Sequence, residues 1–87
     1  MVSIVVPLFN EEESLSVFYD QLVKEIQKLD ENYEIIFIDD GSFDSSLEIL
    51  KKIASKDKSV RIFSFRKNQG KSEALTFGFK MVKGERI

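Results

Sequence analysis

Hydrophobic residues follow two alternating patterns along the chain. Residues 2–6, 33–38 and 60–65 are short segments rich in β-branched and aromatic side chains, which is typical of strands buried in a parallel sheet. After each of them, apolar residues recur every three or four positions, as one face of a helix requires. The sequence therefore predicts three successive strand–helix units.

The ends of these elements carry recognisable signals. Pro7 is expected to end the first strand, and Asn10 with Glu13 resembles a capping box that opens a helix of about 18 residues. Asp44 is expected to cap the second helix. The third helix is expected to end at Gly84, and residues 85–87 are expected to open a fourth strand. The apolar faces of the three helices are predicted to be Leu15, Phe18, Leu22, Ile26 and Leu29, then Leu47, Leu50, Ile53 and Ala54, then Ala74, Leu75, Gly78, Met81 and Val82.

Connections that are long enough to hold helices imply a parallel sheet with right-handed crossovers. The predicted fold class is α/β, with three layers and helices on both faces of the sheet. In this architecture ligands bind beyond the carboxyl ends of the strands. Residues 7–11, 39–44 and 66–71 are therefore expected to meet on one rim.

The composition indicates one small globular domain over residues 1–87. Hydrophobic residues make up 43% and charged residues 32%, which is too apolar for intrinsic disorder. The absence of cysteine and histidine excludes disulfides, imidazole catalysis and the usual zinc sites, so a metal would need oxygen ligands. The first residues do not resemble a signal peptide, and the longest apolar run, residues 35–38, is far shorter than the roughly 20 residues that cross a bilayer. A cytoplasmic location is expected.

Charge is distributed unevenly although the net charge is only -2. Residues 1–50 carry 12 acidic and 2 basic side chains, whereas residues 51–87 carry 3 acidic and 11 basic ones. This asymmetry either draws the two halves together or forms a basic surface for an anionic ligand. Nucleic acid is not expected as a partner, because the basic half has neither a clustered arginine face nor an aromatic RNA-binding signature.

Two adjacent carboxylates, Asp39 and Asp40, directly follow a predicted buried strand, where charge is unfavourable without partners. Turn formation explains Gly41, which permits a positive φ, and Asp44, which caps the next helix. It does not explain Asp39 and Asp40, so we expect at least one of them to contact a ligand. Carboxylates suit the donor edge of a base, ribose hydroxyls or a hard cation.

The basic segment at residues 66–72 contains Gly70-Lys71-Ser72 but is not a P-loop. That motif requires a glycine five residues before Gly70, where this chain has Phe65. What remains is a cationic loop at the start of a helix, which suits either a diphosphate or acidic neighbours.

Three segments, in this order and spacing, resemble the opening motifs of family 2 glycosyltransferases: residues 4–12 (Ile-Val-Val-Pro-Leu-Phe-Asn-Glu-Glu), residues 39–44 (Asp-Asp-Gly-Ser-Phe-Asp) and residues 66–71 (Arg-Lys-Asn-Gln-Gly-Lys). They are most similar to the polyprenyl-phosphate subgroup, which includes dolichol-phosphate mannosyltransferases and undecaprenyl-phosphate sugar transferases. The resemblance implies the nucleotide-binding half of a GT-A fold, with UDP or GDP as the sugar carrier. The nucleotide-binding residues that it implies are Pro7, Asn10, Glu11, Asp39, Asp40, Ser42, Asn68 and Lys71.

Within this set, the resemblance implies that Pro7 and Glu11 line the nucleotide pocket and that Asp39 contacts the base. It places Asp40 and Ser42 close to the nucleoside, and Asn68 with Lys71 on the diphosphate side.

The family pattern continues into a fourth strand that ends in an Asp-x-Asp metal motif. The chain is therefore expected to be the amino-terminal part of a longer inverting enzyme, inactive alone, whose Mg²⁺ or Mn²⁺ ligands and catalytic residues lie outside residues 1–87. The resemblance implies a UDP- or GDP-sugar donor, and its subgroup points to a polyprenyl phosphate acceptor at the cytoplasmic face of a membrane. The residues themselves do not choose between a phosphate acceptor and a sugar hydroxyl, which would need a carboxylate as general base. The alternative is a non-catalytic nucleotide-binding or interaction module on the same half-fold. An unpaired first strand further predicts a homo-oligomer.

Overall fold

A computed structural model of the protein describes residues 1–82. Strands β1 (Val2–Leu8), β2 (Tyr33–Asp39) and β3 (Val60–Ser64) alternate with helices α1 (Leu15–Gln27), α2 (Ser46–Lys56) and α3 (Lys71–Met81). The strands form one parallel sheet in the order β1-β2-β3, in which Val2 lies opposite Tyr33 and Ile35 lies opposite Val60. The three predicted strand–helix units are confirmed.

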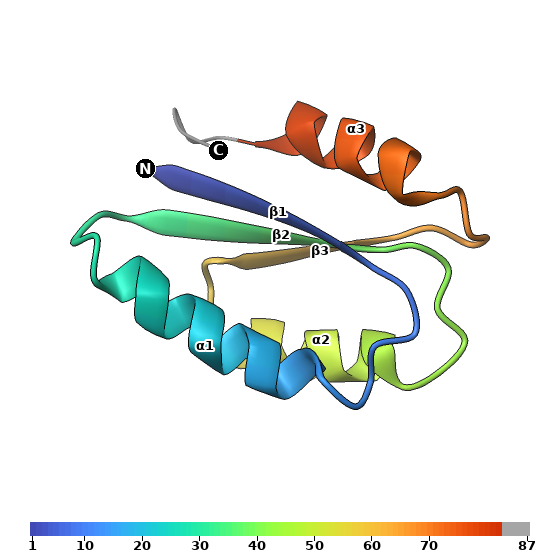
Figure 1. The fold of residues 1–87 in the computed structure, drawn as a ribbon, viewed down its shortest axis with the longest axis horizontal. Coiled ribbons are helices and arrows are strands. Elements are labelled where there is room, and N and C mark those ends of the chain that lie inside the picture. Colours follow the sequence, from blue (N-terminus) through green and yellow to red (C-terminus); the bar gives the residue numbers. More distant parts are fainter. Residues whose placement is uncertain (83–87) are drawn as a thin grey trace.

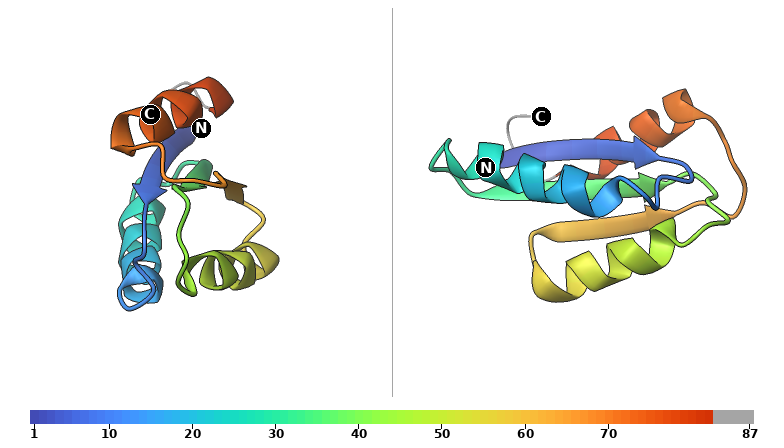
Figure 2. Two further views of the ribbon diagram at one scale, coloured as in Figure 1. Left: turned by 90° about the vertical axis from the view of Figure 1, so that its right-hand side faces the viewer. Right: turned by 60° about the horizontal axis from the view of Figure 1, so that its bottom comes forward.

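Helices cover both faces of the sheet. Helices α1 and α2 lie side by side against one face, and α3 lies against the other (Figure 1). Seen from the end of the strands, the sheet is the middle of three layers (Figure 2). The predicted three-layer α/β architecture is confirmed. None of the helices among residues 1–82 has the length and apolar character needed to span a bilayer.

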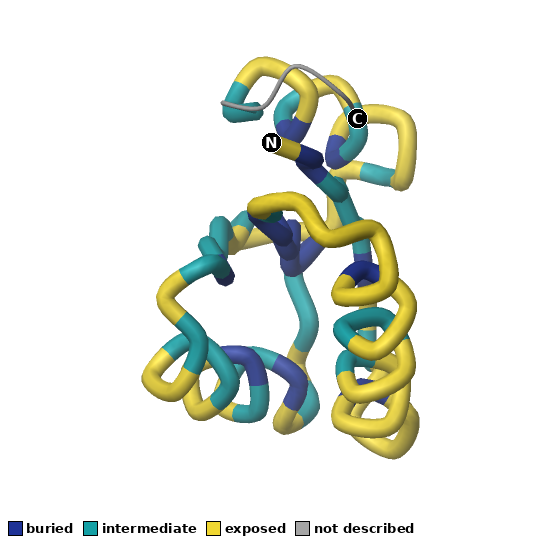
Figure 3. Tube along the Cα trace, turned by 90° about the vertical axis from the view of Figure 1, so that its left-hand side faces the viewer, coloured by how far each residue is buried: buried dark blue, intermediate teal, exposed yellow. Residues whose placement is uncertain are grey.

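The sheet divides the hydrophobic core into two clusters, and the most buried positions follow the strands (Figure 3). Alternate side chains of a strand point to opposite faces. Ile35 and Phe37 of β2 therefore belong to the cluster beneath α1 and α2, whereas Ile36 and Ile38 belong to the cluster beneath α3. All four are fully buried, which places β2 at the centre of the molecule.

Helix α3 approaches the sheet closely at Gly78. A Cβ atom added at Gly78 would lie 2.3 Å from Cγ1 of Val5, so only glycine allows this spacing without displacing that side chain. The ring of Phe77 packs edge to face on Phe63 and Phe65, with ring centroids 5.1 and 5.5 Å apart. Phe63, Phe65 and Phe77 thus pack together in the cluster between α3 and the sheet.

Two boundaries near the first strand differ from prediction. β1 continues through Pro7 to Leu8, and a residue without an N–H is tolerated because β1 pairs with β2 alone among the described strands. The capping box predicted for Asn10 and Glu13 does not form. Asn10 adopts a φ of 52°, a turn follows, and α1 begins only at Leu15.

The ends of α1 and α3 also come earlier than predicted. α1 has 13 residues and ends at Gln27, shortly before Asp30 with its φ of 52°. α3 ends at Met81, whereas Gly84 and the fourth strand predicted for residues 85–87 lie outside the described residues. Self-association through β1 stays a prediction.

Candidate functional site

The loops that follow the three strands gather at one end of the sheet (Figure 1). Hydrogen bonds between the first two loops run in both directions. The N–H of Asn10 donates to Oγ of Ser42 at 2.9 Å, and the N–H of Phe43 donates to Oδ1 of Asn10 at 3.0 Å. The positive φ of Asn10 therefore belongs to a loop junction and not to a helix cap.

A second exchange joins the same two loops. The N–H of Glu12 donates to Oδ2 of Asp44 at 3.2 Å, while the N–H of Ser45 donates to Oε2 of Glu12 at 3.1 Å. Oδ1 of Asp44 also accepts the N–H of Ser46, the first residue of α2. The cap position of α2 is Ser45 and not Asp44 as predicted, so Asp44 bonds to the helix from one residue before the cap. Desolvation raises the pKa of Asp44, but the hydrogen bonds from Ser46 and Glu12 outweigh it and hold the pKa below its usual value.

Asp39 is 1% exposed and holds the end of β2 to two neighbours. Its Oδ1 accepts the N–H of Ser42 at 3.2 Å, and its Oδ2 accepts the hydroxyl of Ser64 at 3.1 Å. Gly41 lies between Asp39 and Ser42 in this turn and has a φ of 78°. The turn role predicted for Gly41 is confirmed, and Asp39 also takes part in the turn.

Asp40 is 4% exposed and reaches across to the basic loop. Its Oδ1 accepts the N–H of Gln69 at 2.6 Å, and its Oδ2 accepts the N–H of Gly70 at 2.9 Å. Both carboxylate oxygens are therefore bonded to consecutive backbone groups just before α3. The basic loop is thus attached to the end of the central strand.

A cavity of about 380 Å³ opens between these loops, a volume typical of small-molecule sites. It brings together five of the predicted site residues, namely Pro7, Glu11, Asp40, Asn68 and Lys71. The other three, Asn10, Asp39 and Ser42, are not among its lining residues and instead support the surrounding loops. Sequence reasoning missed Leu8, Phe9 and Gly70, which also line the cavity. These three residues lie between or beside predicted site residues in the sequence, and this proximity could have indicated that they line the same cavity.

The wall at α3 is suited to an anion. Lys71 is the first residue of α3, and the first N–H that donates to a carbonyl at this end of the helix is that of Ala74, which bonds to Gly70. The preceding N–H groups have no acceptor within the helix, and together with the helix dipole they favour negative charge. The lining also includes the apolar Pro7 and Phe9 and the carboxylate of Glu11. The cavity therefore combines a cationic helix start with apolar and acidic side chains.

The described residues do not fit a divalent cation. Residues 1–82 contain no group of three or more acidic side chains placed to hold a metal ion. The two adjacent carboxylates, Asp39 and Asp40, each use both oxygens to accept hydrogen bonds from N–H or hydroxyl donors of the protein.

Comparison with known proteins places these features in context. The chain matches the family model described as glycosyl transferase family 2 over residues 3–87. It is 37% identical over 87 residues to a putative glycosyltransferase, CsbB, of Bacillus subtilis, covering all of this chain and 26% of that protein. It is 36% identical to an undecaprenyl-phosphate 4-deoxy-4-formamido-L-arabinose transferase of Proteus mirabilis, covering 99% of this chain and 27% of that protein.

Two further proteins extend the comparison. A bactoprenol glucosyl transferase of Shigella phage SfV is 42% identical, with 99% of this chain and 28% of that protein covered. A solved mannosyltransferase of Pyrobaculum calidifontis, in complex with GDP-Man and Mn²⁺, superposes with a TM-score of 0.69 at 22% identity, covering 97% of this chain and 25% of that one. The chain thus spans about a quarter of the length of these relatives.

Proposed function

The chain belongs to glycosyl transferase family 2, and from this premise we propose that its rim cavity binds the nucleoside diphosphate of a UDP- or GDP-sugar. The observation that carries the proposal is the cavity itself. Its lining combines Asn68 and Lys71, at the amino end of α3, with Pro7 and Glu11, at and just after the end of β1. A nucleoside diphosphate has the matching halves, one anionic and one with a flat, partly apolar surface.

The diphosphate belongs at the α3 side in this proposal. Lys71 supplies a full positive charge, and the first turn of α3 supplies backbone N–H donors, which together are suited to phosphate oxygens. Asn68 adds amide donors from the same loop.

The nucleoside belongs at the β1 side. Pro7 and Phe9 offer apolar surface, and Glu11 can accept hydrogen bonds from ribose hydroxyls. Asp39 is assigned to the base, but its carboxylate is buried beneath the turn at Ser42. Contact with a base therefore requires the loop at Ser42 to move and expose that carboxylate.

For the whole protein we propose inverting transfer of the sugar to a polyprenyl phosphate at the cytoplasmic face of a membrane. The names of the undecaprenyl-phosphate and bactoprenol transferases support this acceptor. A phosphate acceptor is already nucleophilic and needs little help from a general base. The solved mannosyltransferase with GDP-Man and Mn²⁺ supports a divalent cation, Mg²⁺ or Mn²⁺, which would stabilise the departing diphosphate. Because residues 1–82 do not fit that cation, its ligands are assigned to other parts of the whole protein.

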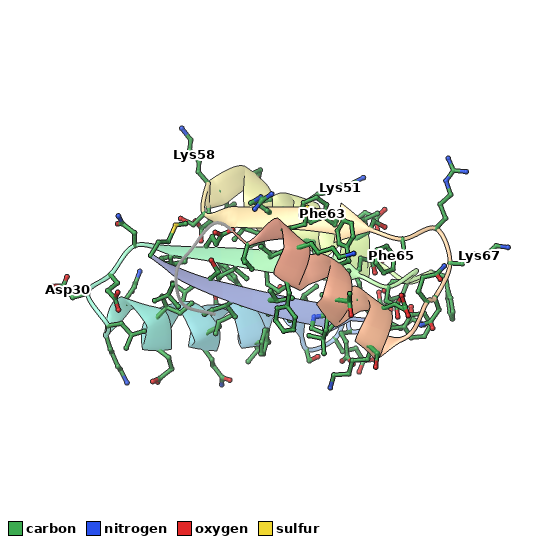
Figure 4. The ribbon with its side chains drawn as sticks, turned by 90° about the horizontal axis from the view of Figure 1, so that it is seen from above. Asp30, Lys51, Lys58, Phe63, Phe65 and Lys67 are labelled. Atoms are coloured by element: carbon green, nitrogen blue, oxygen red, sulfur yellow. The ribbon has the colours of Figure 1, made fainter. Side chains whose placement is uncertain are left out.

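Calorimetric titration of the 87-residue chain with UDP and with GDP tests the proposed site. We expect at least one of them to bind and Lys71→Ala to weaken its binding about tenfold, the effect of one lost charge-assisted hydrogen bond. The matched control is Lys58→Ala, which removes the same charge between α2 and β3, at the other end of the molecule from the loop that carries Lys67 (Figure 4). Absence of binding to wild type, or equal weakening by both variants, would show that the cavity is not the nucleotide site.

A further inference from the structure

Asp40 has a geometry that the proposed nucleotide contact does not explain. Its carboxylate is nearly inaccessible, and its two oxygens accept the N–H groups of Gln69 and Gly70 at 2.6 and 2.9 Å. A side chain that already uses both oxygens in this way is poorly placed to bind a nucleoside directly. It is well placed to hold the backbone that leads into α3.

The neighbouring glycine shows how tightly that backbone is held. A Cβ atom added at Gly41 would lie 2.5 Å from the backbone N of Asn68 and 2.6 Å from the backbone C of Lys67. The basic loop is therefore in close contact with the end of β2 on one side and hydrogen-bonded to Asp40 on the other. The loop is also fixed where it begins, because the N–H of Phe65 donates to the carbonyl of Asp39 at 2.9 Å.

We propose that Asp40 is a positioning residue whose carboxylate fixes the start of α3, and so sets where Asn68, Lys71 and the first N–H groups of α3 meet a diphosphate. The choice of a diphosphate as the ligand rests on the proposed function, whereas the hydrogen bonds of Asp40 do not depend on it. Asp40 acts through the loop, so its effect should fall on the diphosphate part of a nucleotide and spare the nucleoside part.

The test uses Asp40→Asn, which keeps the shape of the side chain. An amide has one acceptor oxygen and one NH₂ group, so it can accept from only one of the two N–H donors and faces the other with its own donor. The matched control is Asp57→Asn, the same change in a carboxylate at the opposite end of the sheet, where Tyr19 and Tyr33 donate to it. Both variants are expected to lower stability, but only one touches the basic loop.

Two measurements on the 87-residue chain separate positioning from mere stability. Amide hydrogen exchange at Gln69 and Gly70, followed by NMR without ligand, should become about tenfold faster in Asp40→Asn and stay unchanged in Asp57→Asn. Calorimetry should show that Asp40→Asn reduces the ratio of UDP to uridine affinity, or of GDP to guanosine affinity, about tenfold, with nucleoside affinity unchanged. Asp57→Asn should leave both ratios as in wild type.

Unchanged exchange at Gln69 and Gly70 in Asp40→Asn would overturn the proposal, and so would an equal loss of nucleotide and nucleoside affinity. Failure of wild type to bind either nucleotide would instead remove the proposed function. In that case the exchange measurement alone decides whether Asp40 fixes the start of α3.

Discussion

Carboxylates hold both ends of the sheet, but the kind of donor that predominates differs between the ends. At the carboxyl end, Asp40 and Asp44 accept from backbone N–H groups of the loops. At the amino end, Oδ2 of Asp57 accepts the hydroxyls of Tyr19 and Tyr33 at 2.6 and 3.1 Å. The exceptions are the Ser64 hydroxyl, which donates to Asp39 at the carboxyl end, and the Ser59 N–H, which donates to Asp57 at the amino end. Backbone bonds fix the path of a loop, whereas side-chain bonds fix one element against another.

Glu34 is a second carboxylate at the amino end that accepts hydrogen bonds from side chains. Glu34 is buried, and it accepts the hydroxyl of Ser3 and a guanidinium N–H of Arg61 at 3.1 Å. Arg61 also donates to the carbonyl of Met81 at 2.7 Å, which ties the end of α3 to the sheet. The amino end thus joins helices to strands. The difference suggests that changes there should lower stability alone, whereas changes at the carboxyl end should also alter ligand binding.

The largest effect is expected from Gly41→Ala at the carboxyl end. The new Cβ would meet the backbone of Lys67 and Asn68 within 2.6 Å, and a φ of 78° is strained for alanine. We expect a loss of about 3 kcal/mol in the free energy of unfolding, measured with urea, from strain and overpacking together. Gly70→Ala is the control, because Gly70 has a φ of 98° but no atom within 4 Å of the new Cβ. Equal losses in the two variants would mean that close contact with the basic loop adds nothing.

Asp57→Ala should have the next largest effect. It leaves the hydroxyls of Tyr19 and Tyr33 without their acceptor and also removes the partner of the Ser59 N–H. We expect a loss of about 2 kcal/mol in the free energy of unfolding. Nucleotide affinity, measured where the variant is folded, should match wild type. A change in affinity would contradict the separation of the two ends.

The acid sensitivity of the amino end should depend on Asp57. Desolvation raises the pKa of Asp57, but hydrogen bonds from Tyr19, Ser59 and Tyr33 outweigh it and hold the pKa below its ordinary value of 3.8. A depressed pKa gives stability that is present above pH 3.8 and is lost as the pH falls through the pKa of the folded state. In urea unfolding across pH 2–6, we expect the advantage of wild type over Asp57→Asn to shrink towards the acid end. A constant advantage would contradict this account.

The stability of the amino end should also decrease at alkaline pH because of Tyr19. Burial raises the pKa of Tyr19 well above its ordinary value of 10.0, and the hydrogen bond to Asp57 raises it further. A raised pKa gives stability that is complete below pH 10 and declines as the pH rises beyond it. Tyr19→Phe has no group to ionise here, so its unfolding free energy should decline less above pH 10 than that of wild type. Parallel declines would show that Tyr19 does not set this limit.

The sequence predicted the secondary structure and the fold better than the hydrogen bonds between the loops. Hydrophobic periodicity identified every described strand and helix, and the rule for the carboxyl ends of parallel strands predicted that Pro7, Glu11 and Lys71 would meet. The partners of Asp40 could not be predicted, because they are backbone groups 29 and 30 residues further along the chain. The local sequence around Asn10 predicts a helix cap. It cannot show that Asn10 instead bonds to Ser42 and Phe43, which lie 32 and 33 residues further along the chain. Asp57 gave no signal, since a single acid after a helix is ordinary at a surface.

The smallest effect is expected from Phe43→Ala, which tests whether aromatic packing also holds the carboxyl end. Phe43 is 84% exposed, and its ring meets that of Phe9 edge to face with centroids 5.8 Å apart. An exposed ring hides little apolar surface on folding, so we expect the free energy of unfolding to change by at most about 0.5 kcal/mol. The backbone N–H of residue 43, which donates to Asn10, is kept in this variant. A loss in urea unfolding as large as that of Asp57→Ala would mean that the ring pair, and not only the carboxylates, fixes the loops around the cavity.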